Sequence, residues 1–338
     1  MPSSLALILC IAFVVYLLHF DHRCAPDVSS ALWISTIWLI YVSSKPLAFW
    51  FGNPNVSLDA GSPYDRSFQI FLLAVSLWLL FRRGAGWIGP LKDNVWLSVL
   101  ILFMLASVVW SPAPFISFKR WVSEIPAVVL GLLISTENSP RNAIRSVLRR
   151  SIYVLIPFSV LLIKYFPQYG VAYSPTEGTL MWTGVAMQKN GLGILASLAS
   201  LFLVGDLTRR WKLKEWRGSR YQFFAEFFLL ALSLWLLKGP GTYSATSIVM
   251  LVTGMSIYIG LMAGRKRRSL ASAKIFMVVM VFLIVYGTTA PLIGKLPGRD
   301  FSSNFGRDST LTGRSDIWKI LVPEAMGKPL LGHGFGGF

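Results

Sequence analysis

The residues with the clearest potential for chemistry are lysines and arginines in the polar segments between long apolar runs. One set of alternate segments holds Lys119, Arg120, Lys189, Arg299, Arg307, Arg314 and Lys319. Ammonium and guanidinium groups bind phosphate oxygens through charge-assisted hydrogen bonds, which are bidentate for arginine. The pattern therefore indicates a ligand that bears phosphate.

Other kinds of catalytic site have little support in the sequence. The histidines His19, His22 and His333 are scattered, and the acidic residues form no pair of carboxylates on one predicted span. No serine-hydrolase elbow, P-loop or His-Glu-x-x-His motif occurs. Cys10 and Cys24 form neither a disulfide framework nor a metal-ligand cluster. We expect no metal and no cofactor.

Lys189, Lys119 and Arg120 each have two interpretations. A charged residue at the entrance of a membrane helix is a functional candidate by default. Lys189 could equally be an interfacial lysine whose ammonium reaches the polar headgroups. Lys119 and Arg120, which precede Trp121, could be ordinary interfacial anchors.

Two candidates near the C-terminal end also have simpler interpretations. Arg314 could be a solvated residue in front of a helix over 317–325, with Ser315 or Asp316 as its cap. His333 lies among glycines, where a polar residue is readily tolerated, and the glycines predict a tight turn.

Composition assigns the chain to the membrane proteins. Of its 338 residues 54% are hydrophobic and only 14% are charged, against about 25% charged in soluble domains. The first apolar run, Leu5–Phe20, lacks a basic n-region and a cleavage site, so it predicts a membrane helix instead of a signal peptide. The net charge of +17 comes from short basic runs between apolar segments, which favours membrane lipids over nucleic acid as the partner.

The predicted fold class is all-α, a polytopic transmembrane helical bundle of about ten spans. Backbone groups in hydrocarbon must be hydrogen-bonded within the segment, which favours helices. The expected spans are Leu5–Phe20, Ala31–Phe51, Ser67–Phe81, Val95–Trp110, Trp121–Ser135, Ser151–Phe166, Gly191–Gly205, Phe223–Leu237, Tyr243–Ala263 and Ala273–Tyr286. Three segments are expected: N-terminal membrane helices (1–60), a core transmembrane bundle (61–286) and the start of a periplasmic loop (287–338).

Lysine and arginine in alternate loops predict the orientation. The basic loops are expected in the cytoplasm, and they contain Arg82, Arg83, Lys92, Arg141, Arg145, Arg149, Arg150, Arg209, Arg210, Lys212, Lys214, Arg217, Arg220, Arg265, Lys266, Arg267 and Arg268. Ten spans would then put the N-terminus outside, with the weakly basic loop 21–30 inside. The alternative is that one early segment is a re-entrant or interfacial helix.

Several motifs occur in an order that resembles a known superfamily. Gly-Arg-Ser-Asp-Ile-Trp at 313–318 and Lys-Pro-Leu-Leu-Gly-His-Gly-Phe-Gly at 328–336 are similar to the signature of O-antigen ligases and O-antigen polymerases. Supporting motifs are Gly-Ser-Pro-Tyr-Asp-Arg (61–66), Trp-Ser-Pro (110–112) before Lys119-Arg120, and Gln-Lys-Asn-Gly-Leu-Gly (188–193). The combination most resembles exopolysaccharide polymerisation proteins.

The resemblance implies a glycosyltransferase of surface polysaccharide assembly in the bacterial inner membrane. Such proteins use glycans on undecaprenyl pyrophosphate at the periplasmic face, without metal or nucleotide sugar. They transfer the glycan to another lipid-linked repeat, or to lipid A-core in lipopolysaccharide biosynthesis; other assembly proteins are expected partners. It implies catalytic roles for Arg314 and Lys189, and substrate binding by Lys119, Arg120, Asn190, Asp316 and Arg299.

Two features depart from the family pattern. The family's periplasmic histidine, a candidate base, and its further C-terminal helices lie beyond the point where this sequence stops, so we expect a fragment, a truncated reading frame or an inactive protein. The histidine often found before Lys-Asn in the family is Gln188 here.

Two other functions remain open from the sequence. A flippase or transporter of lipid-linked sugars predicts ionisable residues at mid-span and broken helices in two related halves. A non-catalytic membrane scaffold is the third hypothesis. The sequence does not distinguish polymerase from ligase, and it identifies neither the glycan nor the oligomeric state.

Overall fold

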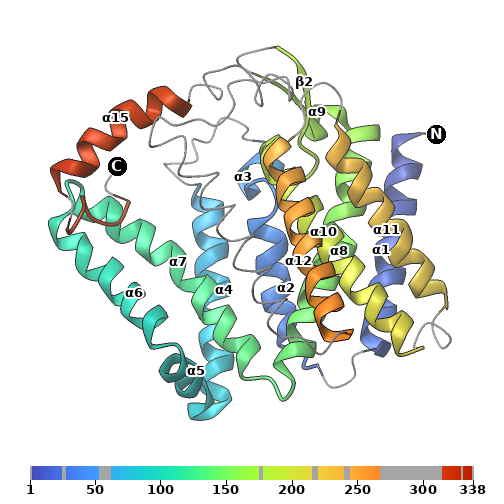
Figure 1. Cartoon of the computed structure of the whole chain (residues 1–338), viewed down its shortest axis with the longest axis horizontal. Coiled ribbons are helices and arrows are strands. Elements are labelled where there is room, and N and C mark those ends of the chain that lie inside the picture. The colour runs from blue at the N-terminus through green and yellow to red at the C-terminus, as the bar shows by residue number, and fades with distance from the viewer. Residues whose placement is uncertain are drawn as a thin grey trace. The chain divides into compact units, whose positions relative to one another are not determined.

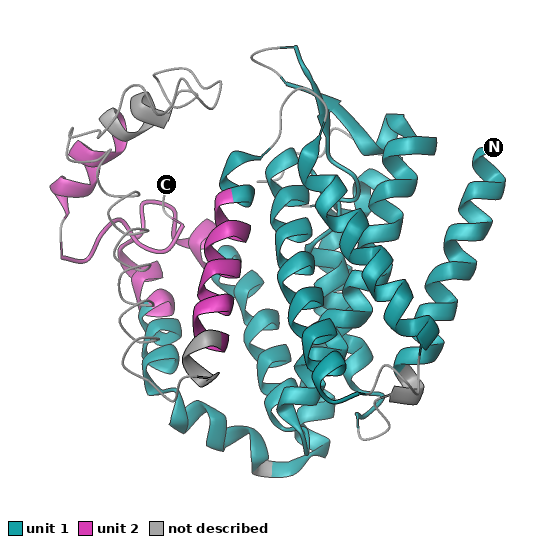
Figure 2. Ribbon diagram, turned by 45° about the vertical axis from the view of Figure 1, so that its right-hand side comes forward, with its two compact units in different colours: residues 1–103, 119–248 teal, residues 104–118, 249–338 magenta. Residues whose placement is uncertain are grey.

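The computed structural model describes residues 2–24, 28–52, 62–174, 178–214, 220–239, 244–266, 314–328 and 330–336. They fall into two compact units (Figure 2). Unit 1 comprises residues 1–103 and 119–248, and unit 2 comprises 104–118 and 249–338. The described residues are predominantly helical, which confirms the predicted helical membrane fold.

Unit 1 is a bundle of long helices (Figure 1). Its elements are α1 (Ser3–Cys24), α2 (Leu32–Val42), α3 (Leu47–Trp50), α4 (Pro63–Arg82), η1 (Gly84–Trp87), α5 (Ile88–Asp93), α8 (Pro140–Tyr165), α9 (Pro167–Gly170), β1 (Val171–Tyr173), β2 (Leu180–Trp182), α10 (Lys189–Lys212) and α11 (Arg220–Lys238). Unit 2 contains η2 (Val108–Trp110) and α15 (Arg314–Gly327). Helices α6 (Val95–Ser107), α7 (Pro114–Ser135) and α12 (Ala245–Lys266) have residues in both units.

Six helices in the described part of the chain are long and apolar enough to cross a membrane: α1, α4, α8, α10, α11 and α12. Leu32–Val42 and Val95–Trp110 are shorter apolar segments. Helix α7 is long enough, but Lys119, Arg120 and Glu124 lie in its first half. The predicted span Ala273–Tyr286 lies outside the described residues, so the number ten stays a prediction. The predicted segment boundaries at 60 and 286 also lie outside them.

Helix α8 forms the centre of unit 1 and contacts α1, α2, α10 and α11. Tyr153 and Ile156 on it are fully buried. Its face toward α2 packs Val147 and Ala143 against Leu32. Helices crossing a bilayer gain close packing and matched polar groups from such contacts, so α8 is the scaffold on which its neighbours are held.

The predicted continuous span over 31–51 is broken in the structure. Helix α2 ends at Val42, and the short α3 begins only at Leu47. Pro46 stands at the break, and proline disfavours helical conformation in the residue before it. The break therefore turns Lys45 and its neighbours into a connection between two helices.

A small antiparallel hairpin forms between the predicted spans Ser151–Phe166 and Gly191–Gly205. Val171 pairs with Trp182 and Tyr173 with Leu180 across β1 and β2. This hairpin is the departure from an all-α fold among the described residues. We call the end of unit 1 that carries the hairpin, α3, α9 and the start of α10 the hairpin end.

The other end of unit 1 contains an ion pair that joins three connections. Arg83, just after α4, pairs with Glu137 between α7 and α8. Ser29, before α2, donates its hydroxyl and amide to the same carboxylate. Burial alone would raise the pKa of Glu137, but these hydrogen bonds and the charge of Arg83 lower it below its ordinary value.

A buried ion network joins α1, α8, α10 and α11 at this same end. The Arg149 guanidinium lies 2.9 Å from Asp21 and 3.0 Å from Asp206. Arg150 contacts Asp21 at 2.6 Å, and Arg210 contacts Asp206 at 3.1 Å. Each of these side chains is buried, so each charge depends on its partners for the solvation that it has lost.

Glu226 of α11 completes the network. It accepts a hydrogen bond from Tyr153, and Arg210 lies 3.3 Å from its carboxylate. Gln222 donates to both Tyr153 and Glu226, at 3.1 and 3.2 Å. The network thus matches carboxylates from three helices with arginines from two.

This network corrects the predicted role of Arg149, Arg150 and Arg210 as loop residues. Helix α8 begins at Pro140 and α10 continues to Lys212, so all three arginines are helical. They are buried because each meets a carboxylate on a neighbouring helix. Asp21 at the end of α1 belongs to the same network, and Ser29 before α2 bonds to Glu137. The described ends of the weakly basic loop 21–30 therefore lie at the end of unit 1 that carries the basic segments.

Candidate functional site

Helix α10 begins at two of the predicted site residues, Lys189 and Asn190. Both side chains are half-buried. Lys189 lines a small hollow together with Trp182, Gly193 and Ser244. The indole of Trp182 packs on that of Trp235 with ring centroids 4.4 Å apart. The β2 strand and the ends of two helices therefore surround the lysine.

The electrostatics at this helix start are unusual. A helix N-terminus carries unpaired N–H groups and a partial positive charge, and favours acidic residues. The first turn of α10 has no acidic residue, and its N-cap, Gln188, makes no side-chain cap hydrogen bond. It carries Lys189 instead, so positive charge is added where the helix dipole is already positive. Such an arrangement can bind a phosphate-bearing anion.

The segment that leads into α10 is buried. Thr183, Gly184, Val185 and Ala186 have little contact with solvent. Gly184 has a φ of +53°, and a Cβ there would lie 2.8 Å from Cβ of Ser159. Only glycine fits both the left-handed backbone and the space beside α8, so the path of the chain into Lys189 is tightly constrained.

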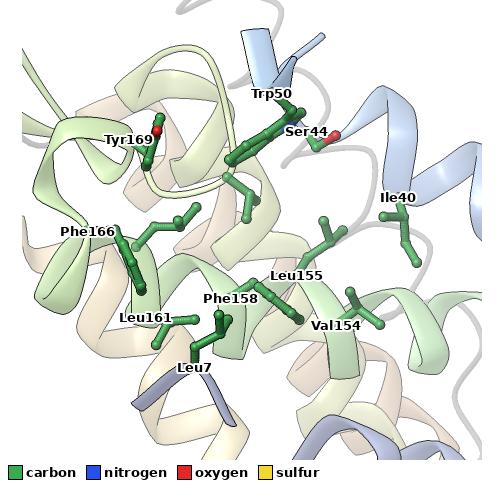
Figure 3. Close-up of a pocket in the computed structure, with 12 residues that line it drawn as sticks. Leu7, Ile40, Ser44, Trp50, Val154, Leu155, Phe158, Leu161, Phe166 and Tyr169 are labelled. Carbon is green, nitrogen blue, oxygen red and sulfur yellow. The ribbon is translucent and has the colours of Figure 1, made fainter. Parts of the chain in front are cut away.

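An apolar cavity of about 430 Å³ lies at the hairpin end (Figure 3). Its wall comes from α1, α2, α3, α8, α9 and the segment before α10, through Leu7, Ile40, Ser44, Trp50, Val154, Leu155, Phe158, Leu161, Leu162, Phe166, Tyr169 and Val185. Aliphatic and aromatic side chains dominate it. Such a surface can hold hydrocarbon and offers little to a sugar or phosphate.

In unit 2, the glycine-rich turn at 330–336 packs on the Trp-Ser-Pro motif. The Trp110 indole donates to the Leu331 carbonyl at 3.1 Å, and the Phe335 amide donates to Ser107 Oγ at 2.9 Å. Gly334 has a φ of +83°, and a Cβ there would lie 2.6 Å from the Ser107 carbonyl oxygen. Two motifs far apart in the sequence therefore meet in this unit.

The predicted turn around His333 is confirmed: Gly332, Gly334 and Gly336 all have positive φ values. His333 Nε2 lies 3.1 Å from the Glu324 carbonyl oxygen and 3.8 Å from a Glu324 carboxylate oxygen. The histidine thus packs back on α15, as a polar residue of the turn would.

The other predicted site residues lie on separate helices. Lys119 and Arg120 are on α7, and Trp121 next to them donates to the Ile101 carbonyl at 3.1 Å. Arg314 and Asp316 lie in the first turn of α15, which begins at Arg314 and not at the predicted residue 317. Their side chains and the whole of Arg299 lie outside the described residues.

Comparison with known proteins agrees with the motifs. A profile of the O-antigen ligase family matches residues 227–338. The exopolysaccharide production protein ExoQ of Rhizobium meliloti (strain 1021) is 26% identical over 253 residues. Both similarities support the predicted resemblance to the O-antigen ligase and polymerase superfamily. The aligned region covers 74% of this chain and 54% of ExoQ, so the chain spans about half the length of the relative that it matches. No solved structure matches it.

The long apolar helices make the chain a multi-pass membrane protein, and both matches are to proteins of polysaccharide assembly. The superfamily profile covers α12, the terminal turn and α15, while Lys189 and Asn190 lie outside it.

Sequence reasoning missed Lys45. It lay within an expected membrane span, and a lysine at that depth is a signal for a functional or structural role. In the structure Lys45 Nζ contacts the segment 183–186 that leads to Lys189.

Proposed function

We propose that the protein transfers glycans from undecaprenyl pyrophosphate in the bacterial inner membrane, at the periplasmic face, during exopolysaccharide assembly. The observation that carries the proposal is the start of α10, where Lys189 and Asn190 stand at a helix N-terminus without acidic residues. An anionic leaving group would find a lysine, an amide and helix N–H groups there.

In the proposed reaction an acceptor sugar hydroxyl attacks the anomeric carbon of the donor glycan. The bond from that carbon to the pyrophosphate oxygen breaks, and the hydroxyl proton goes to a base. Lys189 and Arg314 stabilise the charge that develops on the leaving pyrophosphate, with no metal and no nucleotide sugar. Lys119, Arg120, Asn190, Asp316 and Arg299 bind the substrate.

The apolar cavity supports a lipid-linked donor. It is at the same end of unit 1 as Lys189, and Val185 in its wall is four residues before that lysine. We assign it to part of the prenyl chain, because hydrocarbon is the ligand that its lining suits. The pyrophosphate would then emerge beside the start of α10.

The test is a set of substitutions in the chromosomal gene. Lys189→Ala and Arg314→Ala should each lower polymer formation by about 10²–10³-fold, the usual cost of losing a group that stabilises developing negative charge. Lys189→Arg keeps the charge and should retain more activity than Lys189→Ala. Membrane levels of the protein should not change. Normal polymer length and amount in both alanine variants would refute the site.

A further inference from the structure

Lys45 is a buried lysine whose ammonium donates hydrogen bonds to backbone carbonyls. Its exposed fraction is 4%. Its Nζ lies 2.7 Å from the Gly184 carbonyl oxygen and 2.6 Å from that of Ala186, with Thr183 Oγ1 at 3.4 Å. Buried lysines are rare unless they are paired, so we expect these contacts to have a structural role.

The contacts account for the hydrogen bonding of the segment 183–186. The Ala186 amide donates to the Thr183 carbonyl at 3.0 Å, and the Lys45 amide donates to the Val185 carbonyl at 2.8 Å. The Lys45 ammonium donates to the other two carbonyls, those of Gly184 and Ala186. An unpaired buried carbonyl costs free energy. Lys45 supplies the hydrogen-bond donors for three of the four carbonyls in this segment, those of Gly184, Val185 and Ala186.

Lys45 is itself held in place from its other side. The Trp50 indole donates to the Lys45 carbonyl at 3.1 Å. Asp65 accepts hydrogen bonds from the Leu47 amide at 2.9 Å and from the Tyr41 hydroxyl at 3.0 Å. Asp65 lies in the Ser-Pro-Tyr-Asp-Arg motif at the start of α4, so this motif fixes the α2–α3 connection on which Lys45 lies.

The geometry leaves Lys45 no donor for a ligand. An ammonium has three N–H donors, and three acceptors surround this one. The side chain is therefore suited to hold the backbone and not to touch substrate.

We propose that Lys45 is a positioning residue, which fixes the segment 183–186 and thereby sets where Lys189 and the start of α10 stand. The proposal rests on the proposed function, because Lys189 is the group that Lys45 positions. It assigns a role to the Asp65 motif as well. Asp65 fixes the connection between α2 and α3, and Lys45 on that connection fixes the segment 183–186, which leads to Lys189 three residues later.

The test compares Lys45→Met, Lys45→Arg, Lys189→Ala and the double variant Lys45→Met/Lys189→Ala, in the intact protein with a purified lipid-linked repeat as donor. Lys45→Met should lower kcat by about 10–100-fold with little change in KM, because the donor still binds but Lys189 is misplaced. Lys45→Arg, which keeps charged donors, should restore part of the rate. Lys92→Met, at an exposed lysine of α5, is the matched control and should behave as wild type.

The double variant separates positioning from general stability. If Lys45 acts through Lys189, the double variant should be no slower than Lys189→Ala alone. A double variant whose loss of rate equals the product of the two single losses would contradict the proposal. A wild-type rate in Lys45→Met would contradict it as well. If Lys45→Met does not accumulate, Lys45→Arg and Lys45→Gln are compared instead. A lower kcat in Lys45→Gln than in Lys45→Arg supports the proposal. Wild-type rates in both variants overturn it.

The same experiment distinguishes failure of the two proposals. A wild-type rate in Lys189→Ala would overturn the proposed site and this inference together. An inactive Lys189→Ala beside a fully active Lys45→Met would overturn the inference alone.

Discussion

At the residue scale, single atoms decide which side chain a position accepts. Gly184 and Gly334 both have a positive φ, and each packs closely against another segment of the chain. One stands before the start of α10, and the other stands in the glycine-rich turn that packs on Ser107. A glycine in a loop is a weak signal in sequence, because most have no neighbour within reach. The close neighbours of these two come from distant parts of the chain and could not be predicted.

Gly334→Ala should displace the terminal turn of unit 2. The added Cβ would lie 2.6 Å from a backbone oxygen and also strain a φ of +83°. Gly332→Ala is the matched control, since Gly332 has a φ of +64° but no atom within 4 Å of its Cβ position. Limited proteolysis between 320 and 336 should be faster in Gly334→Ala than in Gly332→Ala. Equal rates in the two variants would contradict the packing described.

At the element scale, buried ion pairs join helices, and the sequence did not predict these pairs. The apolar runs predicted the helices α1, α8, α10 and α11 well, because hydropathy reports membrane spans directly. Their ends were predicted less well: Arg149 and Arg210 were assigned to loops, although both are helical and buried. Arg149 pairs with carboxylates on α1 and α10, and Arg210 pairs with Glu226 on α11 as well as with Asp206 on its own helix. Periodicity in one segment cannot reveal the partners on other helices.

Asp206→Asn should destabilise the four-helix network. The change leaves Arg149 and Arg210 buried without their shared carboxylate. Removing one partner from a buried ion pair typically costs about 3–5 kcal/mol, so the purified protein should melt at a clearly lower temperature. Asp93→Asn, at an exposed position of α5, serves as control. If both variants melt like the wild type, the network does not stabilise unit 1.

At the scale of the whole molecule, charge in the connections predicts how the chain lies in the membrane. Arg83, in the connection after α4, lies at the end of unit 1 away from the hairpin, as do the buried helical residues Arg149 and Arg210. The number of spans and the segment boundaries stay predictions, since Ala273–Tyr286 and both boundaries fall outside the described residues. The resemblance to the O-antigen ligase family, in contrast, was predictable from motif order, and the profile match over 227–338 supports it.

Cysteine labelling should reveal this orientation. In a background with Cys10→Ser and Cys24→Ser, Tyr173→Cys in the hairpin should react with a membrane-impermeant maleimide in intact spheroplasts. Asn142→Cys at the start of α8 should react only after the membrane is opened, because basic segments remain in the cytoplasm. The reverse pattern would refute the orientation and with it the periplasmic site.

The most direct test of the central claim is glycan transfer by the purified protein. The wild-type protein, a lipid-linked repeat and an acceptor repeat are mixed in detergent, and both glycan length and released undecaprenyl pyrophosphate are measured. We expect one lipid pyrophosphate to be released for each glycosidic bond formed, with both reduced by about 10²–10³-fold in Lys189→Ala. A wild-type protein that neither lengthens the glycan nor releases lipid pyrophosphate would contradict the account. Movement of the lipid-linked sugar across the membrane by the same protein in vesicles would then favour a flippase.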